Sequence, residues 1–280
     1  MNVFISNGFL GGSVVDSVAL LHNAGIDNVE LSSGHCDSDS LVALKKLHNQ
    51  GKNFRLHNYF PNIGSPFVLN LSSADSEVRA RSRELVCRAL EWSAELESDY
   101  YAFHAGFRLS PAVSELGGNL TSQQMISVED AKQYFSDELT SIAERAQRLG
   151  VDIAIENNVY DARNYGRYGA DNPFLLCGDQ ATDMILPQGV GILLDVGHLK
   201  VAAQSLGFDP LMSVNRWKDN ISGYHISDND GLTDSNSHIS EVSWFWAALN
   251  QDIKRVTLEV YDRNLESLKH DASLLESAFR

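Results

Sequence analysis

Cysteine is scarce in this chain, and the few cysteines form no recognisable motif. The chain contains three, Cys36, Cys87 and Cys177, and no two of them have the C-x-x-C spacing of a cysteine zinc site. Small secreted proteins that depend on disulfides usually carry an even set of cysteines. We therefore expect buried or incidental thiols, and neither a disulfide framework nor a thiolate-bound zinc ion.

Long hydrophobic runs and an excess of basic residues are also missing. No apolar run approaches the roughly 18 residues of a membrane-spanning helix, and the first ten residues lack the basic start of a signal peptide. We therefore expect a cytoplasmic protein with no membrane partner. The chain has 22 Lys and Arg against 37 Asp and Glu, a formal net charge of -15. Because duplex binding needs cations that displace counterions from phosphates, this charge argues against nucleic acid as a partner, although a local basic cleft is compatible with it.

No low-complexity tract and no Pro/Gly/Ser linker divides the 280 residues, so we expect one domain over residues 1–280. Strand-like and helix-like segments alternate along the whole length. The expected strands are 3–6, 28–31, 53–57, 99–104, 152–156, 191–195, 221–225 and 255–259. Eight strand-then-helix units predict an α/β fold, a single (β/α)8 TIM barrel. The rival is an open doubly wound sheet, but its GxGxxG and phosphate-loop motifs are absent.

The helices are expected between these strands, several of them ending at a glycine. The expected helices are 13–23, 40–49, 75–96, 127–149 and 264–279. Segment 105–127 is long for a structureless connection, so it is expected to be a functional lid or partly helical. Segment 160–172 is expected to be a polar loop, with a short helix after it.

Potential metal ligands stand at the last position of six expected strands. They are His57, His104, Glu156, Asp195, His225 and Glu259, and His198 and His238 lie in the loops just beyond. The carboxyl ends of barrel strands form one rim, so these residues should converge on one cavity. Carboxylates and imidazoles without a thiolate suit a divalent ion such as Mn, Zn, Co or Mg.

The two glutamates are the strongest candidates, because each follows an apolar run. A carboxylate buried at the end of 153–155 or of 256–258 needs a partner, and a metal ion would be one. The core ligand set is therefore predicted to be Glu156, Asp195, His225 and Glu259. His57 and His104 are ligands of further ions, substrate-binding groups or packed histidines. Weaker candidates are Glu30 and His35 as cavity residues, and Arg108, Arg163 and Arg167 as cations for a substrate phosphate or carboxylate, unless these arginines are merely solvated.

These motifs resemble the xylose isomerase-like barrel superfamily, which holds sugar isomerases and epimerases together with the endonuclease IV group. The resemblance rests on NVELSSGH, LHNYFPNIGSPFVLNLSS, YAFHAGF, IAIENN, ILLDVGH, GYHISDND and VTLEVYD. By similarity to the ketose 3-epimerases, Glu156, Asp195, His225 and Glu259 would hold one divalent ion. His198 would contact the substrate, and the two glutamates would exchange protons with it.

The resemblance implies a sugar or sugar-phosphate isomerase or epimerase with a small-molecule substrate, in a family where homo-oligomers are common. The metal would polarise a carbonyl and stabilise an enediolate, while a glutamate takes a proton from the adjacent carbon and returns it. His57, His104 and His238 would join His198 as substrate-binding residues. Gly231 stands near the position where the epimerases carry an arginine that touches the sugar, so the substrate need not be a free ketose.

Part of the sequence is closer to endonuclease IV, in which a histidine-led motif, an NLxS sequence and a later histidine surround three zinc ions. The matching ligands here are His57, His104, Glu156, Asp195, His198, His225, His238 and Glu259. Asn236 replaces an aspartate ligand, which should weaken one metal position, and Asn157-Asn158-Val159 replaces a glycine-containing continuation. The alternative function is therefore a zinc phosphodiesterase acting on abasic DNA. A third interpretation is a barrel that only binds a small ligand.

Overall fold

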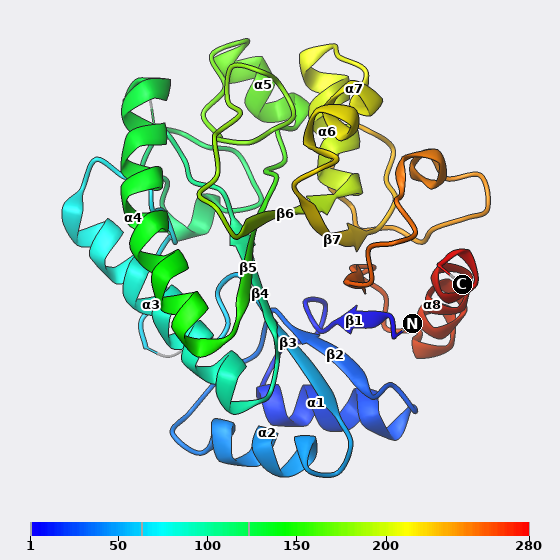
Figure 1. The fold of residues 1–280 in the computed structure, drawn as a ribbon. Coiled ribbons are helices and arrows are strands. Elements are labelled where there is room, and N and C mark those ends of the chain that lie inside the picture. The colour runs from blue at the N-terminus through cyan, green and yellow to red at the C-terminus, as the bar shows by residue number, and fades with distance from the viewer. Residues whose placement is uncertain (1, 63, 123, 280) are drawn as a thin grey trace.

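Eight parallel strands close into a barrel in the order in which they occur in the chain (Figure 1). The computed structural model describes residues 2–62, 64–122 and 124–279. The strands are β1 Phe4–Ser6, β2 Asn28–Leu31, β3 Asn53–His57, β4 Tyr100–His104, β5 Asp152–Glu156, β6 Val190–Asp195, β7 Ile221–Ile226 and β8 Val256–Leu258. β1 pairs with both β2 and β8, which closes the ring.

The helices lie outside the strands, and the C-terminal helix lies near the N-terminal strand (Figure 1). They are α1 Val14–Asn23, α2 Ser40–His48, α3 Ser76–Glu95, α4 Val128–Leu149, α5 Ala162–Tyr168, α6 Val196–Leu206, α7 Pro210–Trp217 and α8 Leu265–Ala278. Two short 3-10 helices, η1 Val113–Glu115 and η2 Trp244–Ala248, lie in loops. No helix in the described part of the chain combines the length and the apolar character needed to cross a membrane.

Sequence-local signals set most of these boundaries. β6 is an apolar run buried on both faces, as a strand covered by helices should be. It ends at Asp195, whose side chain accepts a hydrogen bond from the His198 backbone N–H and so caps the start of α6. α4 begins after the capping residue Ser127 and ends at Gly150, which adopts a left-handed φ of 69°.

The barrel prediction is confirmed, and the strand boundaries agree within one residue. One helix was misplaced. The short helix expected after Asn172 does not occur in the described segment 173–189, and α5 instead lies inside the expected polar loop. The reason is a local cap, because the Asp161 carboxylate accepts a hydrogen bond from the Asn164 N–H and supports the first turn. The single domain over residues 1–280 stays a prediction.

The strand register brings the polar strand ends to one level. His104 is the Cα partner of Glu156 across β4 and β5, and Asp195 is the partner of His225 across β6 and β7. Glu259 lies one residue beyond β8, and its N–H still donates to the Ile226 carbonyl. The carboxyl ends of these strands therefore form the rim on which a site can be built.

Candidate functional site

Four buried side chains meet at the carboxyl end of the barrel. Glu156, Asp195, His225 and Glu259 each offer one potential ligand atom, and these atoms all lie within 4.8 Å of one another. His225 lies at the centre of this group. Its Nδ1 is 2.9 Å from Glu259 Oε2, 3.3 Å from Glu156 Oε1 and 3.9 Å from Asp195 Oδ2. We call these four residues the carboxylate–histidine cluster.

The cluster contains buried polar atoms without hydrogen-bond partners. Glu156 is 0% exposed, and within residues 2–62, 64–122 and 124–279 neither of its carboxylate oxygens nor Nδ1 of His225 has a hydrogen-bond partner. Burial, with repulsion from Glu156 and Glu259, raises the pKa of Asp195 to about 7. Unpartnered buried carboxylates are costly, and a donor set of three carboxylates and one imidazole suits a divalent cation. The residues therefore fit a divalent metal ion.

A fourth carboxylate, that of Glu30, supports His225 from the opposite side of its ring. Glu30, on β2, forms a hydrogen bond of 3.1 Å between its Oε2 and His225 Nε2, and the same oxygen accepts a hydrogen bond from Thr257 Oγ1 at 2.8 Å. Metal-binding histidines usually donate their second ring N–H to such a group, which fixes the ring and its tautomer. From the sequence alone Glu30 is only a weaker cavity candidate, because no local pattern relates it to His225.

His57 and His104 lie beside Glu156, and both approach the same oxygen. His57 Nε2 is 3.1 Å and His104 Nδ1 3.4 Å from Glu156 Oε2. Burial lowers the pKa of His104 to about 4, so its imidazole is neutral at pH 7, the form in which histidine binds metals. The structure thus brings both histidines to the carboxylate–histidine cluster.

His198 stands at the edge of the cluster and is held from two sides. Its Nδ1 is 2.9 Å from the Asn157 carbonyl oxygen, and its Nε2 is 3.2 Å from Asp234 Oδ2. Burial opposes protonation, but Asp195 and Asp234 together raise the pKa of His198 well above its ordinary value. The Asn157 side chain also pairs with the backbone of Asp195. Sequence reasoning missed Asn157 and Asp234, although Asn157 directly follows Glu156 in the IAIENN motif.

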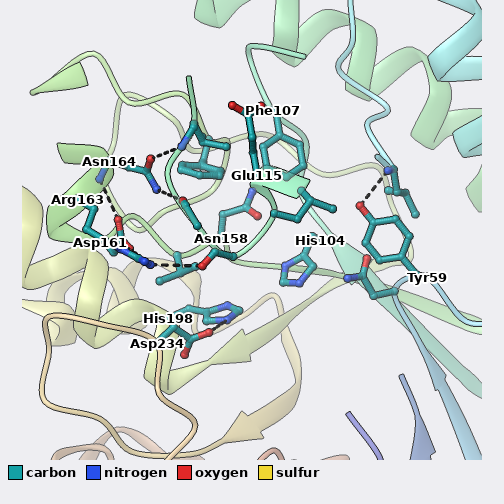
Figure 2. A pocket seen from close by; sticks show the side chains of 18 residues that line it. Tyr59, His104, Phe107, Glu115, Asn158, Asp161, Arg163, Asn164, His198 and Asp234 are labelled. Atoms are coloured by element: carbon teal, nitrogen blue, oxygen red, sulfur yellow. Dashed lines mark hydrogen bonds and ion pairs between the residues drawn. The ribbon is translucent and has the colours of Figure 1, made fainter. Parts of the chain in front are cut away.

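A cavity of about 260 Å³ adjoins the cluster at His104 and His198. Figure 2 shows Tyr59 on one side of this pocket, Asp161, Arg163 and Asn164 on the other, and His198 with Asp234 at a third edge. Loop 105–127, expected to be a lid or partly helical, contains η1 and supplies several lining residues. The volume lies just below the range of roughly 300–1,000 Å³ that small-molecule sites usually have.

Several residues named from the sequence lie elsewhere. His238 does not line the pocket, because its ring lies between Asp271 Oδ2 at 2.6 Å and Asp262 Oδ2 at 2.9 Å. His57 is buried and is also not a lining residue, and His35 is exposed. Arg163 lines the pocket, whereas Arg108 and Arg167, the other two rim arginines, do not. A substrate contact by His238 therefore finds no support in this arrangement.

Residues 18–272 match the family model described as xylose isomerase-like TIM barrel. The chain belongs to this family. The match confirms the resemblance that the strand-end motifs indicated, and it spans all the residues of the carboxylate–histidine cluster and Glu30.

Two solved structures and one sequence relative are similar to this xylose isomerase-like chain. A D-tagatose 3-epimerase-like protein superposes with a TM-score of 0.74 at 19% identity, covering 99% of this chain and 97% of that one. D-psicose 3-epimerase of Clostridium cellulolyticum H10, solved with D-tagatose, has a TM-score of 0.62 at 14% identity, with coverage of 100% and 99%. An uncharacterized protein of Methanocaldococcus jannaschii, MJ1311, is 24% identical over 221 residues, which are 76% of this chain and 68% of that protein.

Proposed function

We propose that this xylose isomerase-like protein is a divalent-metal-dependent sugar or sugar-phosphate isomerase or epimerase. One observation carries the proposal: four buried ligand atoms lie within 4.8 Å of one another, beside a pocket of about 260 Å³. The structural neighbours named as D-tagatose 3-epimerase-like and D-psicose 3-epimerase support it at the level of the fold.

Glu156, Asp195, His225 and Glu259 would hold the metal ion. When bound, a divalent cation would polarise a substrate carbonyl and the neighbouring hydroxyl oxygen. Glu156 and Glu259 would then take a proton from the adjacent carbon and return it to the same or the neighbouring position. The Tyr261 hydroxyl donates to Glu259 Oε1 at 3.2 Å and would hold this carboxylate in place.

The pocket residues would bind the sugar. His104 and His198 line the cavity and offer ring nitrogens to hydroxyl groups. The pair of His198 with Asp234 fixes its ring at the cavity edge. His57 contacts Glu156 and is not a lining residue, so we assign it to positioning this carboxylate and not to the substrate.

Proton exchange from solvent tests the proposal. The metal-loaded protein is incubated in D2O with D-fructose, D-psicose, D-tagatose and their 6-phosphates, and deuterium incorporation next to the carbonyl is followed by NMR. We expect exchange on at least one sugar, and Glu259→Gln to slow it about 10²- to 10⁴-fold, the usual contribution of a general acid or base. Glu241→Gln, at an exposed position, should leave exchange unchanged. Undiminished exchange in Glu259→Gln would remove this residue from proton transfer.

The endonuclease IV-like alternative retains one supporting observation. His57, His104 and Glu156 form a second group with ligand atoms in mutual reach, which a further ion could use. The position of His238 and the net charge of -15 weigh against this function. Elemental analysis of protein purified without added metal separates the two. One ion per chain favours the isomerase or epimerase, whereas two or three zinc ions with cleavage of an abasic duplex would favour the phosphodiesterase.

A further inference from the structure

The pocket beside the carboxylate–histidine cluster has one broad apolar side. Its apolar lining comes mainly from loop 105–127 and the segments that pack on it, and includes Leu69, Phe107, Leu116, Leu120 and Phe174. Phe107, Leu120 and Phe174 belong to one buried hydrophobic group, against which Leu116 packs. Polar groups line two other sides: His104 and His198 with Asp234 lie next to the cluster, and Asp161, Arg163 and Asn164 lie on the side of α5 (Figure 2). The cavity thus offers an apolar wall, formed mainly by the loop 105–127, and polar groups both at the cluster and beside α5.

The arginines that could have bound a phosphate hold loops together instead. Arg108 is 7% exposed, and it pairs with Asp171 Oδ1 at 2.5 Å and donates to the carbonyls of Asn172 and Ile126. Arg167 donates to the Thr121 carbonyl at 2.6 Å. Neither is a lining residue, so both guanidinium groups serve to join loop 105–127 to the α5 region.

The charge on the pocket wall is negative. Arg163 is the single Arg or Lys among the described lining residues. Its Nε donates to Asp161 Oδ2 at 2.7 Å and its Nη2 to the Gly117 carbonyl at 3.3 Å, so its charge is neutralised locally. Glu115 and Asp234 add two further carboxylates to the wall. Asp234 pairs with His198 at the edge next to the cluster, which leaves Glu115 as the carboxylate beside Leu116. A phosphate ester placed there, with close to two negative charges at pH 7, would face this like charge, and the neighbouring cation, Arg163, is already paired.

We infer that the pocket selects an uncharged sugar that carries an apolar substituent, and that it rejects phosphorylated sugars. The inference rests on the proposed function, because it places the carbonyl end of the sugar at the carboxylate–histidine cluster. The substituent then lies against Phe107, Leu116 and Leu120, where its burial from water favours binding. The proposed function leaves open whether the substrate is a sugar or a sugar phosphate, and this inference selects the sugar.

Binding of matched ligands to the metal-loaded protein tests the inference by isothermal titration calorimetry. The probes are D-fructose and D-tagatose, their 6-phosphates and their 6-O-benzyl ethers. We expect each benzyl ether to bind at least about tenfold more tightly than its parent sugar, the discrimination an apolar pocket commonly provides, and each phosphate to bind more weakly than the parent. Phosphates that bind as tightly as the parent sugars, benzyl ethers without an advantage, or no saturable binding by any of the six compounds would overturn it.

Two pairs of variants test whether the pocket wall causes these differences in affinity. Leu116→Ser should remove the advantage of the benzyl ether, whereas Val113→Ser, in the same loop but 44% exposed and not lining the pocket, should preserve it. Glu115→Lys, beside Leu116 on the pocket wall, should strengthen binding of the 6-phosphates about tenfold, whereas the same charge change at the exposed Glu241 should not. Equal effects in the members of either pair would contradict the assignment of the pocket.

Failure of this inference can be distinguished experimentally from failure of the proposed function. Deuterium exchange on a sugar phosphate but on no uncharged sugar would uphold the isomerase or epimerase and overturn the inference. Tight binding of the benzyl ethers without exchange on any sugar would uphold the inference and overturn the proposed function.

Discussion

Glu30 determines which nitrogen of His225 faces the other three carboxylates. Its carboxylate lies 2.9 Å from Nε2, which leaves Nδ1 directed at Glu259 and Glu156. We predict that Glu30→Gln weakens metal binding about 10- to 100-fold, the usual cost of losing such a supporting group. Competition with a chelating dye measures this affinity without any assay of activity. Thr257→Val, which removes only the hydrogen bond to Glu30, should have a smaller effect. An unchanged metal affinity in Glu30→Gln would disprove this positioning role.

His238 contributes to the stability of the fold, because it forms ion pairs with two carboxylates away from the pocket. Burial disfavours its charged form, but Asp271 and Asp262 outweigh this and raise the pKa of His238 above 6.5. A raised pKa means that the stabilisation is complete below the unfolded-state pKa and is lost as pH rises through the folded-state pKa. We therefore predict that His238→Gln lowers the free energy of unfolding more at about pH 5.5 than at about pH 9.

Screening by solvent limits how much free energy of unfolding the His238 ion pairs contribute. The His238 side chain is 43% exposed, and ion pairs that water screens are worth about 0–1 kcal/mol. Urea unfolding at the two pH values, with His270→Gln in α8 as the control, measures the difference. A loss of stability that does not depend on pH would show that the ion pairs contribute nothing.

At the scale of elements, Asn70 connects the loop after β3 to the loop after β4. Its Oδ1 accepts a hydrogen bond from the Phe107 N–H at 3.0 Å, and its Nδ2 donates to the carbonyls of Phe107 and Leu109. Gly106 allows this approach, because a Cβ there would lie 1.7 Å from Ser72 Oγ. The NLSS motif at residues 70–73, which resembles a motif of endonuclease IV, thus holds two loops together in this chain.

We predict that Asn70→Ala lowers the free energy of unfolding by about 1–3 kcal/mol, because it leaves buried backbone groups of loop 105–127 without partners. Denaturant unfolding measures the loss, and limited proteolysis should show earlier cleavage within this loop. Asn119→Ala, at an exposed position of the same loop, is the matched control. Equal stability of the two variants would mean that Asn70 does not hold the loop.

The elements differ in how far the sequence predicts them. Strands such as β5 are predicted to the residue, because an apolar run bounded by a polar residue is a local signal. The partners across the barrel are not local. Glu30 meets His225 only because the register places it beside Ser6 and the ring then closes through β8. The helix α5 differs from the expectation because its capping residue, Asp161, stands in a polar segment whose composition is typical of a loop. The ligand and proton-transfer roles of the carboxylate–histidine cluster stay predictions, since proximity alone does not test them.

At the scale of the whole molecule, the carboxylate–histidine cluster concentrates part of the net charge of -15 in the interior. A bound divalent cation would compensate this charge in the folded state only, so metal should stabilise the fold by mass action. At a metal concentration of about a hundred times Kd this stabilisation is about 2.7 kcal/mol, which for a chain of this size raises Tm by about 5–10 °C. Differential scanning calorimetry with and without a chelator measures the shift.

The variant Glu156→Gln tests whether the rise in Tm on adding metal comes from binding at the carboxylate–histidine cluster. The variant removes a buried carboxylate that faces the imidazoles of His57, His104 and His225 at 3.1–3.4 Å, so without metal its Tm should be lower than that of the unsubstituted protein. It also removes a proposed ligand, so the rise in Tm on adding metal should disappear. Glu241→Gln, at the exposed control position, should retain the full rise. A metal-dependent rise that survives in Glu156→Gln would place the ion elsewhere than at the end of β5, and with it the chemistry proposed for this rim.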